Sequence, residues 1–118
     1  NPLHARLDEI RRALFSPDVD DATVRGYFRR MQPESQRALV ELSVLHLLPR
    51  SGPLRCPALV LAAANDGFFA PGSVRATAAH YGAGCEVLDG LAHAMMLERR
   101  WKDVADRVID WIETTVVP

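Results

Sequence analysis

An acidic residue and a histidine each follow a short apolar run in this chain. Asp66 comes two positions after the end of the run Ala58–Ala64, and His93 comes shortly after the run Cys85–Leu88. In an open parallel sheet, residues that follow the strands meet at the edge where ligands bind. Imidazole transfers protons near neutral pH, and a carboxylate on one ring nitrogen fixes its tautomer. The two residues therefore predict the acid and the base of a nucleophile–histidine–acid relay.

Both residues also have simpler structural interpretations. Asn65-Asp66-Gly67 is a strong turn sequence, which needs no chemistry to explain it. A single histidine matched by motif alone is only a hypothesis for catalysis. Asp89 is a second candidate acid, although its place in the turn before His93 favours capping. The placement of Asp66 and His93 after successive strands favours them as a catalytic pair.

The chain contains no sequence typical of the nucleophile of such a relay. Its serines are Ser16, Ser35, Ser43, Ser51 and Ser73, and none lies in a Gly-x-Ser-x-Gly motif. Removing the nucleophile from a relay of this kind forfeits most of its rate. We therefore expect this chain alone to be inactive.

The first part of the chain, residues 1–52, has only helical patterns. Helices are expected over residues 4–14, from Asp20 or Asp21 to Met31, and from Pro33 to Leu48. The third pattern is apolar on more than one side, so it needs another surface to cover it. We expect a helical cap or lid resting on the rest of the protein.

The second part, residues 53–118, alternates between strand and helix. Strands are predicted within residues 58–64 and 85–88, with helices at 71–81 and 98–114. The last helix has an apolar stripe that should face the core, whereas Glu98, Arg99 and Arg100 should form its solvated first turn. This order predicts an α/β fold with a βαβα unit of a parallel sheet. Two strands leave their outer edges unpaired, so we expect a missing N-terminal half, or a second copy, to cover them.

These motifs, in this order, resemble the C-terminal half of the α/β-hydrolase fold family. The resemblance rests on Ala58-Leu-Val-Leu-Ala-Ala-Ala-Asn-Asp66-Gly-Phe-Phe-Ala-Pro71, on Leu88-Asp-Gly-Leu-Ala-His93, and on the closing helix from Trp101 to Trp111. It implies that the helices before Pro57 are the family's lid, that Asp66 orients His93, and that His93 is general base and then general acid. Two departures are Ala92, where the family usually has glycine, and the absent nucleophile elbow, which precedes the lid in family order.

The resemblance implies a hydrolase of esters, thioesters or related acyl bonds, with a small-molecule substrate and no cofactor. Phe68 and Met95 would then line the substrate site, although methionine is equally a core filler. Because one fold supports many reactions, a haloperoxidase-like member is an alternative. A non-enzymatic association module and one half of a split enzyme are others.

Composition excludes several classes of protein. The chain has 118 residues, 48% of them hydrophobic and 25% charged, with a net charge of −1. This balance argues against disorder, a nucleic-acid groove and an anionic membrane surface. Its longest apolar run is too short to span a bilayer. No metal site is expected, because His4, His46, His80 and His93 lack paired ligand spacing.

The cysteines and the N-terminus bear on the cellular compartment. Cys56 and Cys85 are expected to be buried, reduced thiols, although a disulfide between them stays open. The first residues lack the layout of a signal peptide. These features predict a cytoplasmic protein. The absence of an initiator methionine suggests an engineered piece, a processed product or a proteolytic fragment of a longer chain.

Overall fold

The computed structural model describes residues 2–33, 35–45 and 52–116. Three helices come first: α1 (Pro2–Leu14), α2 (Asp21–Phe28) and α3 (Gln36–Leu45). They are followed by β1 (Leu59–Ala63), α4 (Pro71–Tyr81), β2 (Gly84–Leu88), the short 3-10 helix η1 (Met95–Leu97), α5 (Trp101–Trp111) and the π-helical turn η2 (Ile112–Val116). The end expected for the third helix, at Leu48, lies outside the described residues. None of the described helices is both long enough and apolar enough to cross a membrane.

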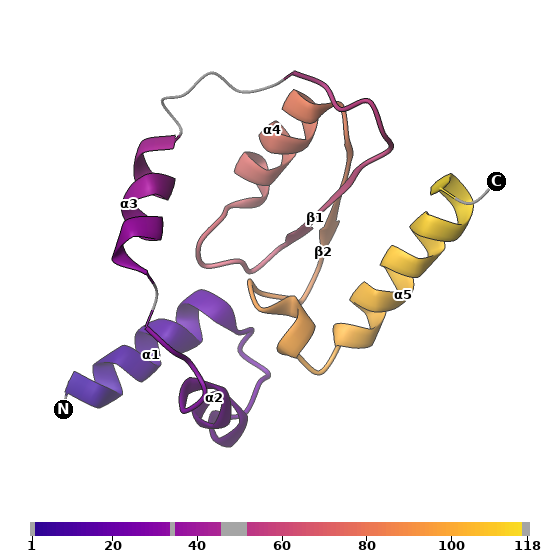
Figure 1. Cartoon of the computed structure of the whole chain (residues 1–118). Helices are drawn as coiled ribbons and strands as arrows, with labels where there is room; N and C mark the ends of the chain where they lie inside the picture. Colours follow the sequence, from indigo (N-terminus) through magenta and orange to yellow (C-terminus); the bar gives the residue numbers. More distant parts are fainter. Residues whose placement is uncertain (1, 34, 46–51, 117–118) are drawn as a thin grey trace.

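The two strands form a parallel sheet, as the sequence predicted. Leu59 lies opposite Gly84 and Ala63 lies opposite Leu88, so both strands end at the same edge (Figure 1). The pairing continues past the strands, because the amide of Ala64 donates to the carbonyl of Leu88 over 3.0 Å. The loops that carry Asp66 and His93 therefore leave the sheet side by side.

Helix α4 connects the strands and packs against both of them. Proline at position 71 suits the first turn of a helix, where an amide hydrogen has no partner. Gly82 ends the helix with φ of 66°, a left-handed conformation that glycine adopts without steric cost. The boundaries predicted for this helix are confirmed.

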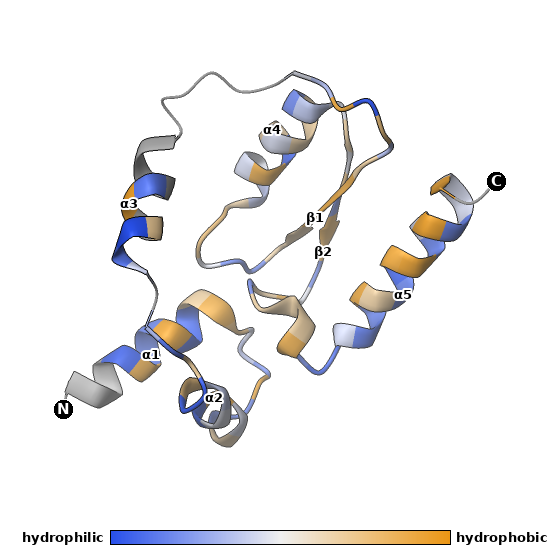
Figure 2. Ribbon diagram, viewed as in Figure 1, coloured by the Kyte–Doolittle hydropathy of each residue, from blue (hydrophilic) through white to orange (hydrophobic). Residues whose placement is uncertain are grey.

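Helix α5 lies on the other side of the strands from α4 (Figure 1). Its Arg107 donates two hydrogen bonds to the carboxylate of Glu86 in β2, from Nε to Oε2 and from Nη2 to Oε1. Its apolar stripe is covered only in part by the described residues: Val104, Ala105 and Trp111 are half-buried, whereas Trp101 is 54% exposed and Ile109 is 49% exposed. Figure 2 shows a hydrophobic stripe along one side of α5.

A small core joins the N-terminal helices to the sheet. Phe15, Val19 and Val24 are buried together with Ala94, which follows the candidate histidine. Phe15 also stacks on Tyr27, with ring centroids 5.8 Å apart. The ends of α1 and α2 are thus packed against the loop after β2.

The cysteines differ from the expectation. Cys56 is exposed and Cys85 is half-buried, and both thiols are free. Cys56 is not buried because it lies in the exposed segment 52–57, before β1 begins.

Candidate active site

Asp66 and His93 form a hydrogen-bonded pair at the carboxyl edge of the sheet. Asp66 Oδ2 lies 2.9 Å from His93 Nδ1. The side chain of Asp66 is 9% exposed, whereas that of His93 is 36% exposed and can meet a ligand. The other candidate acid, Asp89, is exposed, and its carbonyl oxygen accepts a hydrogen bond from Arg100. Asp66 is therefore the carboxylate that holds His93.

The second oxygen of Asp66 closes a turn. Asp66 Oδ1 accepts hydrogen bonds from the amides of Phe68, over 2.7 Å, and Phe69, over 3.0 Å. Burial acts to raise the pKa of Asp66, but the hydrogen bonds from Phe69, His93 and Phe68 hold it below its ordinary value of 3.8. Near neutral pH Asp66 is thus an acceptor only, so Nδ1 carries the shared proton. Neutral His93 then has a free lone pair on Nε2.

Two aromatic rings flank the imidazole. The ring of Phe68 meets that of His93 edge-on at 4.9 Å, and the ring of Phe69 lies 5.7 Å away. Both phenylalanines are largely exposed, Phe68 at 58% and Phe69 at 56%. Both belong to the turn closed by Asp66, so neither enters a strand or helix that would bury it.

A pocket of about 310 Å³ opens beside the pair. Its walls combine apolar side chains with two hydroxyls and the pair itself: Leu61, Phe69, Val74, Met95, Ser73, Thr77, Asp66 and His93. Of the two expected substrate-binding residues, Met95 lines this pocket, whereas Phe68 contacts the imidazole and Phe69 lines the pocket instead. The pocket can accommodate a small, mainly apolar group next to His93.

The C-terminal end of α1 binds both loops of the pair. The amide of Gly67 donates to the carbonyl of Ala13 over 3.2 Å, and the amide of Ala94 donates to that of Leu14 over 2.8 Å. A Cβ atom at position 67 would lie 2.5 Å from the Cα of Ala13, so the approach requires glycine. Two consecutive carbonyls of α1 thus hold the residues that follow Asp66 and His93.

Glu98 is a buried residue that the sequence analysis placed wrongly. Its side chain was expected in the solvated first turn of the last helix, but α5 begins at Trp101 and Glu98 is only 3% exposed. Glu98 Oε1 accepts from the amides of Ser16, over 2.7 Å, and Ala92, over 3.3 Å, and Oε2 accepts from Ser16 Oγ over 2.6 Å. No local signal distinguishes this glutamate from a surface residue, because its main partner lies far away in the sequence.

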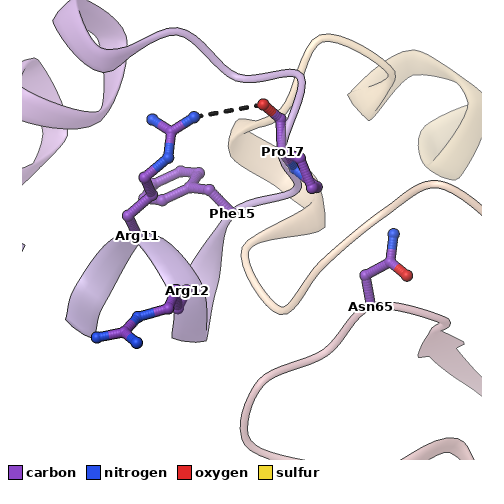
Figure 3. A pocket seen from close by; sticks show the side chains of 5 residues that line it. All are labelled: Arg11, Arg12, Phe15, Pro17 and Asn65. Carbon is purple, nitrogen blue, oxygen red and sulfur yellow. Dashed lines mark hydrogen bonds between the residues drawn. The ribbon is translucent and has the colours of Figure 1, made fainter. Parts of the chain in front are cut away.

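A second pocket, of about 450 Å³, lies between the end of α1 and the turn after β1. Figure 3 shows Arg11, Phe15 and Pro17 on one side of it and Asn65 on the other. Arg11 is engaged there, since it donates to the carbonyl of Pro17 over 3.3 Å and pairs with Asp21. This pocket adds no reactive group to the site.

The remaining chemistry of the site is limited. Within residues 2–33, 35–45 and 52–116, no hydroxyl or thiol forms a hydrogen bond with His93 Nε2. The same residues contain no cluster of three or more His, Cys, Asp or Glu side chains that could hold a metal ion. The pair can therefore accept and return a proton, but it needs a nucleophile or a water molecule to act on. Comparisons with protein-family models, curated proteins and solved structures give no match to this chain.

Proposed function

We propose that this chain carries the acid and the base of a hydrolase acting on ester, thioester or related acyl bonds. The hydrogen bond between Asp66 and His93, at the shared edge of two parallel strands, carries the proposal. The proposed enzyme has the α/β-hydrolase fold, with residues 1–52 as its lid and its nucleophile on polypeptide outside these 118 residues. It acts in the cytoplasm on a small-molecule substrate without a cofactor, and the chain by itself is inactive.

Each group has a defined role in this reaction. His93 Nε2 removes the proton of a nucleophilic hydroxyl or thiol as that group attacks the acyl carbon. Asp66 stabilises the resulting imidazolium through Nδ1–H, and Nε2 then passes the proton to the leaving group. In the second half, His93 Nε2 takes a proton from a water molecule as the water oxygen attacks the acyl carbon. The bond between that carbon and the nucleophile then breaks, the acyl group leaves as a carboxylic acid, and His93 returns the proton to the nucleophile. The pocket beside Met95 and Phe69 holds the apolar part of the substrate.

Substitution of the base tests the proposal. In the protein expressed from its complete reading frame, His93→Ala should lower kcat for a nitrophenyl acyl ester by about 10⁶-fold, since it removes the proton acceptor. The exposed His80, replaced by alanine, is the matched control and should leave kcat within about twofold. Wild-type turnover by His93→Ala would refute the hydrolase proposal.

A second candidate function is a non-enzymatic association module. It is favoured by the exposed apolar side chains of α5 and η2, which include Trp101, Ile109 and Ile112. A monodisperse monomer in analytical ultracentrifugation, across a wide range of concentrations, would count against this function. The ordered acid–base pair has no role in such a module, so we favour the hydrolase.

A further inference from the structure

We propose that Glu98 is a positioning residue for His93, an inference that rests on the proposed function of His93 as the base. Glu98 is one of the few buried polar residues in the part of the chain that the structure describes. It accepts hydrogen bonds from Ser16 and from the amide of Ala92, the residue immediately before His93. Its carboxyl group therefore joins the base-carrying loop to the segment that follows α1.

The backbone amides of Ala92 and Ala94, on either side of His93, are both connected by hydrogen bonds to residues 14–16, where α1 ends. The amide of Ala92 reaches Ser16 through Glu98, and the amide of Ala94 donates directly to the carbonyl of Leu14. This double attachment fixes the backbone of His93 while its ring stays 36% exposed. Because a misplacement of about 1 Å can cost about 100-fold in rate, fixing this turn should matter for catalysis.

The hydrogen bonds predict which substitutions the site tolerates. In Glu98→Gln, the amide oxygen can accept from Ser16 N and Ala92 N, as Oε1 does now. The new NH₂ group can donate to Ser16 Oγ, whose own proton can go to Asp18 Oδ1, 2.7 Å away. In Glu98→Leu, both buried amides lose their acceptor, which a buried site tolerates poorly.

The experiment compares kcat and KM for variants of the protein expressed from its complete reading frame. We expect Glu98→Gln to keep kcat within about threefold and Glu98→Leu to lose about 100-fold in kcat at unchanged KM. Glu98→Asp, which keeps the acid but shortens its reach, should lose about tenfold and covers the case in which Glu98→Leu does not fold. The exposed Glu113, replaced by leucine, is the matched control.

A second readout needs no turnover. The Nδ1–H proton of His93 should give a downfield NMR signal in wild type and Glu98→Gln, and this signal should broaden or disappear in Glu98→Asp and Glu98→Leu. Unchanged kcat and an unchanged signal in folded Glu98→Asp and Glu98→Leu would overturn the role of Glu98. If His93→Ala keeps activity, the hydrolase proposal fails instead, and the NMR signal alone still decides whether Glu98 positions the ring.

Discussion

At the scale of single residues, Asp66 shows that two competing interpretations of a sequence can both apply. The motif Asn65-Asp66-Gly67 favours a turn, and the order of the strands favours an acid beside His93. The structure separates these roles between the two carboxylate oxygens: Oδ1 closes the turn through the amides of Phe68 and Phe69, and Oδ2 holds the imidazole. The turn therefore fixes the orientation of the acid.

The ionisation of Asp66 should make folding sensitive to acid. Its pKa is lower in the folded chain than its ordinary value of 3.8, so its contribution to stability is complete above about pH 4. That contribution is lost as the pH falls through the lower, folded-state pKa. Asp66→Asn should cost about 1–2 kcal/mol in the free energy of unfolding at pH 7 and less at pH 3.

Urea unfolding at the two pH values measures this difference. The exposed Asp89, replaced by asparagine, is the control, because no hydrogen bond to its carboxylate is present among the described residues. An Asp66→Asn variant that loses the same free energy at pH 3 as at pH 7 would contradict the linkage.

At the scale of elements, the expected lid is attached to the site by its first helix. Consecutive carbonyls of Ala13 and Leu14 accept from the residues that follow Asp66 and His93. The end of a helix leaves carbonyls without intrahelical partners, and the two loops supply the missing donors. Helix α1 thus sets the spacing of the loops, so this end of the helical region is part of the site's framework.

Gly67→Ala tests this contact between helix and loop. The added methyl group would lie 2.5 Å from the Cα of Ala13 and 2.7 Å from the carbonyl oxygen of Arg12, both backbone atoms that cannot rotate away. We expect a loss of about 2–3 kcal/mol in the free energy of unfolding, because α1 must shift. Gly72→Ala is the matched control: no atom lies within 4 Å of its new methyl group, and alanine favours the helix by up to about 1 kcal/mol. Equal stabilities of the two variants in urea would refute the tight contact.

Sequence patterns predicted the elements whose signals are local. The apolar run before Asp66, the proline at the start of α4 and the glycine at its end lie next to the structures they specify. The pairing of Glu98 with Ser16 joins residues 82 positions apart, and no periodicity or capping rule encodes it. The exposure of Cys56 likewise depends on the packing of distant elements, so a preference for burial could not predict it.

At the scale of the whole molecule, the described elements leave much apolar surface uncovered. The apolar stripe of α5 and η2 includes Trp101, Ile109 and Ile112, whose exposed fractions are 54%, 49% and 40%. Among the described residues, β1 and β2 pair only with each other. A two-stranded sheet is marginal in water without further strands or a covering layer. The hydrolase proposal accounts for both features, because its remaining half would extend the sheet and cover α5.

Ile109→Lys tests that coverage. In the protein expressed from its complete reading frame, a lysine placed under a covering layer should lower the free energy of unfolding by about 2–3 kcal/mol, since an unpaired charge is buried. The neighbouring exposed Asp110, replaced by lysine, changes charge on the same helix without entering the apolar stripe and should stay within about 0.5 kcal/mol of wild type. If Ile109→Lys lowers the free energy of unfolding no more than this control does, α5 stays exposed in the complete protein. Its apolar side would then be a surface for association, which is the behaviour that the alternative function requires.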